Sequence, residues 1–287
     1  MMIEFIGHIM DYAFLQKALL TSVIVGIISG VIGSFIILRG MALMGDAISH
    51  AILPGVAISY MIGVNYFYGA VVMGILTALG IGFVSQKSRV KSDSAIGIVF
   101  SAFFALGIIL LMKAQTAVDL EAILFGNVLS VRTSDMWLTI IIGIVVLFVI
   151  FLFYKEFLIT TFDPTISKAY GLPTQFIHYM LMVLLTLVTV ASLQTVGVIL
   201  VVAMLITPAS TAYLLTNRLS TMIFLSAGFG ALSAVIGLYL SFRYNLTSGA
   251  VIVLVATVLF ILAFLFSPQQ GIVWRALRTN KQKTISQ

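Results

Sequence analysis

The sequence contains no cysteine and few charged residues, and both absences narrow what the chain can be. Without cysteine it has neither a disulfide framework nor a thiolate metal site. Only 8% of its residues are charged, against roughly 25% in an ordinary soluble domain, while 61% are hydrophobic. Lipid is therefore the expected solvent for most of this chain.

Several motifs are missing as well. No Gly-x-x-x-x-Gly-Lys-Ser/Thr phosphate loop occurs, so any nucleotide must be bound by another subunit. No His-Glu-x-x-His motif occurs, which disfavours an intramembrane metalloprotease. The 15 basic residues outnumber the 9 acidic ones, but they punctuate apolar segments and form no patch on a polar surface. We therefore expect no nucleic-acid binding, and the start of the chain shows no removable signal peptide.

Repeated apolar stretches have the length of about 20 residues that crosses a bilayer. The predicted spans are 14–38, 46–62, 66–84, 94–112, 136–154, 176–192, 195–215, 222–242 and 248–266. The sixth and seventh lie so close together that a hairpin and one long bent helix both fit. We predict one all-α transmembrane domain over residues 1–287, with eight or nine helices and nine favoured. Gly26, Gly30 and Gly33 should let neighbouring helices approach closely.

The distribution of lysine and arginine predicts how the chain is oriented, because short cytoplasmic loops are rich in both. Nine spans with the N-terminus outside place most of the basic residues inside and few of them outside. The expected cytoplasmic residues are Arg39, Lys87, Arg89, Lys91, Lys155, Lys168, Arg218 and the tail residues Arg275, Arg278, Lys281 and Lys283. The expected outer residues are Lys17, Lys113, Arg132 and Arg243. The C-terminus is therefore predicted to be cytoplasmic.

Two polar segments between the spans have a pattern of their own. Residues 119–130, within an extracellular segment 114–134, have apolar residues at a helical period and predict a short surface helix. The cytoplasmic segment 161–175 contains Asp163 followed by Pro164, a favourable helix start. Gly171 and Pro173 form a matching stop. This short helix needs a packing partner, which is either its own bundle or a cytoplasmic motor subunit.

The chemistry concentrates between Arg39 and Pro54, in the sequence RGMALMGDAISHAILP. Asp46 opens an apolar run, whereas the other acidic residues lie in loops or at the edges of spans. A carboxylate inside a membrane helix costs about 2.5 to 3.5 kcal/mol on insertion scales and usually marks an ion path. His50 follows at the i+4 position and shares a helix face with Asp46. The pair is a candidate site for a divalent cation.

One aspartate and one histidine are too few ligands for tight binding. Two copies of the chain around a twofold axis would supply two carboxylates and two imidazoles. Ligands without sulfur suit manganese, iron or zinc better than copper(I). An alternative of equal weight is that Asp46 caps its helix and bonds Ser49, while His50 is satisfied by a neighbouring helix.

The segment from Arg39 to Gly55 resembles the signature of the ABC-3 family of ABC-transporter permeases, which import manganese, zinc or iron. The resemblance extends to ILFGN at residues 123–127, to FDPTISKAYGLP at 162–173 and to VGVILVVAMLITPA at 196–209. Within the family the chain is most similar to the manganese permeases of Gram-positive bacteria.

The resemblance implies a permease homodimer in the bacterial plasma membrane, working with two cytoplasmic ATPase subunits and an extracellular metal-binding lipoprotein. It implies that the ion, Mn²⁺ or alternatively Zn²⁺ or Fe²⁺, is bound by Asp46 and His50. It also implies that the helix between Asp163 and Pro173, including Ala169 and Gly171, couples the permease to the ATPase. The chain would not itself be an enzyme and would hold no permanent cofactor.

A secondary transporter that couples metal entry to protons or sodium is the rival hypothesis. Such transporters commonly bury several ionisable groups and use broken helices near the membrane midplane. This sequence buries one carboxylate, which favours the ATP-driven importer.

Overall fold

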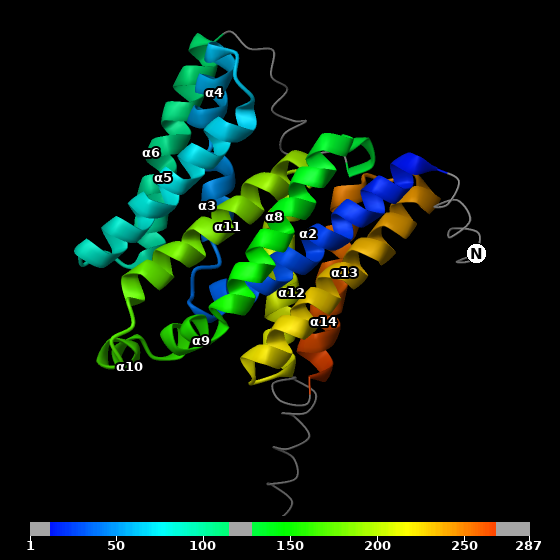
Figure 1. Ribbon diagram of the computed structural model, residues 1–287. Coiled ribbons are helices and arrows are strands. Elements are labelled where there is room, and N and C mark those ends of the chain that lie inside the picture. Colours follow the sequence, from blue (N-terminus) through cyan, green and yellow to red (C-terminus); the bar gives the residue numbers. More distant parts are fainter. Residues whose placement is uncertain (1–11, 115–127, 268–287) are drawn as a thin grey trace, which may run out of the picture.

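A computed structural model describes residues 12–114 and 128–267, and these residues form a bundle of helices without a β-strand (Figure 1). The predicted all-α membrane fold is confirmed. The elements are α2 (Ala13–Leu38), α3 (Met44–Ala51), α4 (Leu53–Ile62), α5 (Tyr66–Lys87), α6 (Ser92–Lys113), the 3-10 turn η1 (Val128–Ser130), α8 (Thr133–Leu152), α9 (Tyr154–Phe162), α10 (Pro164–Ala169), α11 (Thr174–Val196), α12 (Val198–Leu215), α13 (Leu219–Tyr244) and α14 (Ser248–Phe266).

Within the described residues, eight helices are long and apolar enough to cross a membrane. They correspond to eight of the nine predicted spans. The remaining predicted span, 46–62, is present as two shorter helices, α3 and α4, which meet at Ile52. Pro54 explains this division, because proline lacks an N–H group and clashes with the carbonyl one turn earlier.

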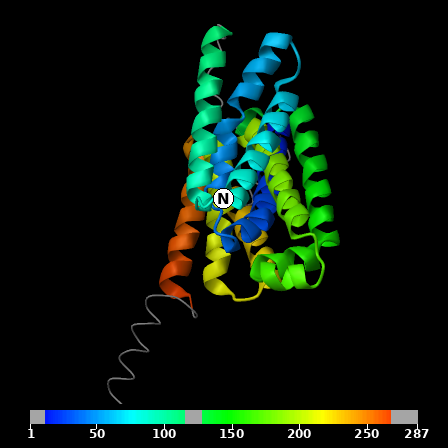
Figure 2. The ribbon, with the colours of Figure 1, turned by 90° about the vertical axis from the view of Figure 1, so that its left-hand side faces the viewer.

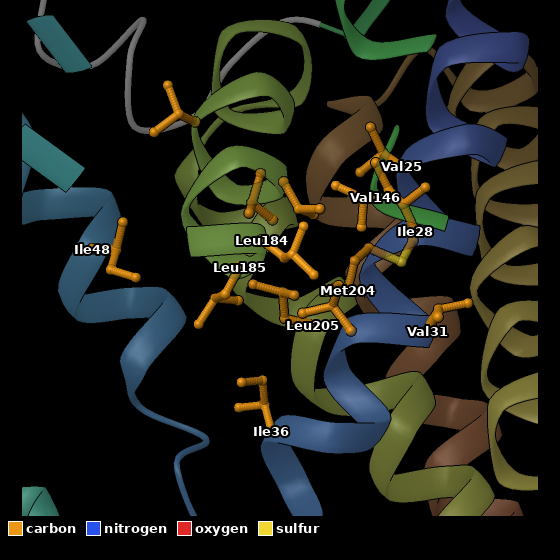
Figure 3. Close-up of a cluster of buried hydrophobic side chains, with 14 of the residues drawn as sticks. Val25, Ile28, Val31, Ile36, Ile48, Val146, Leu184, Leu185, Met204 and Leu205 are labelled. Atoms are coloured by element: carbon orange, nitrogen blue, oxygen red, sulfur yellow. The ribbon is translucent and has the colours of Figure 1, made fainter. Parts of the chain in front are cut away.

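The sixth and seventh predicted spans are the separate helices α11 and α12. Gly197 lies between them with φ of 82° and ψ of 164°, a conformation open to glycine and strained for other residues. The chain reverses there, so the hairpin is correct and the long bent helix is not. Figure 3 shows the consequence, with Leu184 and Leu185 of α11 beside Met204 and Leu205 of α12 in the buried core.

The connections predicted to face the cytoplasm lie at one end of the bundle. The α2–α3 connection, the α5–α6 loop, α9, α10 and the end of α14 are at the lower ends of the helices in Figure 1. Figure 2 shows α9 and α10 lying across that lower end. Most of segment 114–134 and the basic tail from Arg275 to Lys283 lie outside the described residues, as does the motif at 123–127.

Helix α2 packs through glycine against its neighbours. A Cβ atom on Gly26 would lie 2.6 Å from the carbonyl oxygen of Gly230 in α13, and one on Gly30 would lie 2.7 Å from that of Ser226. The hydroxyl of Ser226 donates a hydrogen bond of 2.8 Å to the Gly30 carbonyl. Gly33 makes a similarly close approach to Leu205 of α12. The expected role of these three glycines in helix packing is confirmed.

Replacing Gly230 by alanine should therefore destabilise the protein. The added methyl group meets the backbone of Gly26, which has no flexible atom that can move aside. Overpacking of this kind typically costs about 1–3 kcal/mol. Thermal unfolding in detergent should show a lower midpoint for Gly230→Ala.

Gly228→Ala is the matched control, because it lies on the same helix with nothing within 4 Å of the added atom. Alanine also favours a helix over glycine by about 0.5–1 kcal/mol. The Gly228 variant should be as stable as the natural protein or slightly more so. Equal losses in both variants would refute the close-packing explanation.

Candidate metal site

The helix that carries Asp46 begins immediately after a tight connection. Helix α2 ends at Leu38, and Gly40 has a positive φ of 67°, which glycine adopts without strain. Helix α3 then starts at Met44, so Asp46 lies in its first turn, near the free backbone N–H groups. Negative charge is favourable at this end of a helix. The local sequence thus directs a carboxylate into the bundle at a position that partly stabilises it.

Asp46 and His50 face each other along one side of α3. The Nε2 atom of His50 lies 3.6 Å from Oδ1 of Asp46, the i,i+4 relation that the spacing predicts. The Asp46 side chain is 47% exposed and that of His50 is 25% exposed. The imidazole packs against Phe100 and Phe104 of α6, with ring centroids 6.0 and 5.7 Å away. These rings hold the imidazole beside the carboxylate.

The alternative interpretation of Asp46 as a helix cap does not match the geometry. The residue before α3 is Leu43, and no side chain caps the helix start. Ser49 donates its hydroxyl to the carbonyl of Gly45 at 2.9 Å and not to Asp46. The Asp46 carboxylate is consequently directed toward His50 and open space.

That open space is a cavity of about 380 Å³ between α3, α12 and α14. Its walls are mainly aliphatic, and three polar side chains reach it: Asp46, His50 and Thr207. The apolar lining residues are Val198, Ile199, Val202, Ala203, Ile206 and Val253. Ligand sites commonly have this form, in which a few polar groups in an apolar wall fix the position of what binds.

Thr207 is a site residue that the sequence did not single out. One turn later, Thr211 donates its hydroxyl to the Thr207 carbonyl at 2.7 Å, the usual arrangement of threonine in a helix. The Thr207 hydroxyl makes no hydrogen bond within residues 12–114 and 128–267, and it remains available to a ligand in the cavity. Threonine is common in membrane helices, so its type alone gives no signal. Only the fold brings it to Asp46.

The site is incomplete within one chain. In the part of the chain that the structure describes, no group of three or more His, Cys, Asp or Glu residues could hold a metal ion. Asp46, His50 and one hydroxyl therefore leave most positions around a divalent cation to water or to another molecule.

The predicted coupling segment is also formed. The Asp163 carboxylate accepts hydrogen bonds from the backbone N–H groups of Thr165 and Ile166, at 2.9 and 2.8 Å, and caps α10. Helix α10 ends at Ala169, Gly171 has a positive φ of 74°, and Pro173 directly precedes α11. The start and stop signals are confirmed. The helix α9 before this segment was not predicted.

Part of this segment is apolar and exposed. Ile166 is 48% exposed and Tyr170 is 78% exposed at the lower end of the bundle. The opposite side packs inward, since Ser167 is buried and donates its hydroxyl to the Asp163 carbonyl. The segment thus presents apolar side chains beyond the end of the long helices.

Comparison with known proteins matches residues 11–267 to the ABC 3 transport family. The manganese transport system membrane protein MntC of Listeria monocytogenes is 68% identical over 274 residues, which cover 96% of this chain and 98% of that protein. The manganese import system permease protein ScaB of Streptococcus gordonii is 50% identical and covers 96% of this chain and 99% of its own. A chain in the solved structure of PsaBC from Streptococcus pneumoniae in complex with Fab has a TM-score of 0.84 and 52% identity, covering 94% of this chain and 98% of that one.

Proposed function

Because the chain belongs to the ABC 3 transport family, we propose that it is the membrane-spanning permease subunit of an ATP-driven importer of manganese ions. The observation that carries this proposal is the cavity into which Asp46 and His50 project side by side. Relatives that match nearly the whole chain are named for manganese transport. Their names support manganese over zinc or iron.

Two copies of the chain would complete the site. Around a twofold axis, each copy supplies the Asp46 carboxylate, the His50 imidazole and the Thr207 hydroxyl, so the pair offers six donors. Oxygen-rich octahedral coordination suits manganese, whereas zinc is usually satisfied by four ligands. The incomplete site in one chain and the cavity beside it support a homodimer with the ion on its axis.

The energy source lies outside this chain under the same proposal. The segment from Asp163 to Pro173 would dock on a cytoplasmic ATPase through Ile166 and Tyr170. This end of the bundle and the C-terminus would then be cytoplasmic. Its exposed apolar side chains support such a partner. An extracellular metal-binding lipoprotein would deliver the ion to the opposite end, at the surface of a bacterial plasma membrane.

An ion-coupled secondary transporter is the second candidate, and one observation favours it. The division of a predicted span into α3 and α4 beside the site resembles the broken helices of such transporters. Those proteins also bury several ionisable groups at the ion path. Here Asp46 and His50 are the ionisable residues that line the cavity, and the family match favours ATP.

Removing either ligand should abolish manganese uptake. Removing a residue that only hydrogen-bonds to a metal ligand lowers metal affinity by about 10- to 100-fold. Removing a ligand itself, Asp46 or His50, should therefore lower manganese affinity by at least about 100-fold. Asp46→Ala and His50→Ala should therefore show no uptake of radioactive manganese in proteoliposomes containing the full complex, with assembly unchanged. Asp93→Ala, at an exposed first turn of α6, is the control and should transport normally. Normal uptake by both site variants would refute the assignment of Asp46 and His50 as metal ligands.

Thr207 should affect manganese more than zinc. Thr207→Val keeps the side-chain shape and removes the hydroxyl, so manganese should bind about tenfold more weakly, a difference of about 1.4 kcal/mol. Zinc binding should change little because four donors remain. Titration of the purified complex with each metal measures this difference.

The matched control is Thr211→Val, whose hydroxyl is buried and bonded to the Thr207 carbonyl. It should leave both metal affinities unchanged. If Thr207→Val weakens both metals equally, or neither, then Thr207 does not contribute to selection.

The docking role of the coupling segment can be tested at Tyr170. Tyrosine at an interface centre commonly contributes about 2 kcal/mol, so Tyr170→Ala should weaken ATPase association by about 30-fold. Tyr244→Ala is the control, because Tyr244 is also largely exposed but lies at the opposite end of the bundle. Copurification of the ATPase with each variant gives the result. Equal retention by both variants would contradict docking at Tyr170.

A further inference from the structure

Arg39 connects three elements at the lower end of the bundle. Its Nε donates to the Thr161 hydroxyl at 3.1 Å, and its Nη2 donates to the Thr160 hydroxyl at 2.9 Å. Its Nη1 lies 3.3 Å from Nδ1 of His178. Because a guanidinium can only donate, Nδ1 of His178 must be the accepting, unprotonated nitrogen. Arg39 at the end of α2 is thereby bonded to both α9 and α11.

These contacts leave the charge of Arg39 without a negative partner. All three acceptors are neutral, and no carboxylate forms an ion pair with Arg39 among the residues that the structure describes. Burial lowers the pKa of Arg39 to about 10, with no opposing charge to raise it. Taking a cation out of water costs several kcal/mol unless an anion and good hydrogen bonds compensate. The arrangement is therefore an unfavourable one for a residue with only a packing role.

A carboxylate with one unpaired oxygen lies one turn away on α9. The Oε2 atom of Glu156 is buried and has no hydrogen bond. Glu156 and Thr160 are in the i,i+4 relation and share a face of α9, and Thr160 also donates its hydroxyl to the Glu156 carbonyl at 2.7 Å. The face of α9 that contacts Arg39 thus carries the neutral Thr160 hydroxyl and, one helical turn earlier, the carboxylate of Glu156.

Arg39 lies between the coupling segment and the helix that carries Asp46. Arg39 begins the connection that leads to α3 and Asp46, whereas α9 leads directly into α10, and α11 follows α10. Figure 1 shows the end of α2, α9 and the start of α11 gathered at the lower end of the bundle. The three hydrogen bonds of Arg39 therefore bridge the coupling segment and the helix of the candidate metal site.

We propose that Arg39 is a positioning residue that transmits movement of α10 to α3. It alternates between the neutral acceptors Thr160, Thr161 and His178 and the carboxylate of Glu156. The exchange is a shift of α9 past the end of α2 by one helical turn, about 5.4 Å. The observed arrangement leaves Oε2 of Glu156 unpaired, the other would leave Nδ1 of His178 without its donor, and ATP binding can select between them. This inference rests on the proposed function, because it assumes an ATPase acting on α10.

The first test measures coupling in the complete complex reconstituted in proteoliposomes. Arg39→Lys keeps the charge but loses the planar fork of donors, and Glu156→Gln removes only the negative charge. Each variant should assemble and hydrolyse ATP, while manganese transported per ATP falls about fivefold or more, the lower range of coupling between sites. The double variant should be no worse than either single one. Arg243→Lys, exposed at the opposite end, should leave the ratio unchanged.

A purely structural role predicts a different result. Arg39→Lys would then lower thermal stability and yield, yet transport per ATP would be normal in the protein that remains. Glu156→Gln would be neutral or stabilising, because its buried Oε2 atom has no hydrogen-bond partner to lose. That outcome would overturn the inference, and Glu156→Gln keeps the test valid even where the Arg39 variant folds poorly. If manganese uptake by the natural complex does not depend on ATP, the proposed function itself is refuted.

The second test measures the shift itself. Because the chain has no cysteine, spin labels at Leu43→Cys and Lys155→Cys in one copy of a dimer whose other copy is unlabelled report the distance between the α2–α3 connection and α9. That distance should change by about 5 Å between the nucleotide-free complex and the complex trapped with ATP and vanadate. The change should be absent with Glu156→Gln. An equal distance in both nucleotide states of the natural sequence would exclude the alternating contact.

Discussion

An ionisable side chain inside a membrane helix needs surroundings other than lipid, and the arrangement around Asp46 follows from that requirement. The connection through Gly40 places the carboxylate in the first turn of α3, where the helix dipole favours it. The aromatic rings of α6 support the neighbouring imidazole. Beside Asp46 and His50, a cavity remains between α3, α12 and α14. The carboxylate and the imidazole therefore face this cavity and avoid the apolar packing of the core.

The opposite requirement applies to the helices that hold the site in place. Lipid gives little hydrophobic drive for one helix to bind another, so close backbone approach and hydrogen bonds must supply the stability. Helix α2 meets α13 through Gly26 and Gly230, and the hydroxyl of Ser226 bonds the carbonyl of Gly30. Large aliphatic side chains of α8, α11 and α12 fill the remaining space (Figure 3). These contacts make α2 and its neighbours the fixed frame of the protein.

The sequence predicts the frame well because its signals are local. Long apolar runs locate the membrane helices, and Asp163, Pro164 and Gly171 mark the ends of α10 in the chain itself. Helix α9 escapes prediction because Lys155 and Glu156 interrupt the apolar pattern with charge. The roles of Thr207 and Arg39 depend on residues far away in the sequence, and no periodicity contains that information. The pairing of Asp46 with His50 is predictable because it lies within two turns of one helix, whereas the proposed second copy of the site would belong to another chain.

The contrast between the tightly packed α2 and the helices α3 and α9 indicates which parts move in an ATP-driven cycle. Helix α2 is held along its length by backbone contacts with α13, so it cannot shift without breaking them. Helix α3 is short, is separated from α4 near Pro54 and borders a cavity on the side that carries Asp46 and His50. Helix α9 is bonded to the end of α2 through neutral hydroxyls that exchange at low cost. Under the proposed function, the work of the ATPase is therefore expressed as a rearrangement of α9 and α3 around a stationary α2, with Arg39 at the point where they meet.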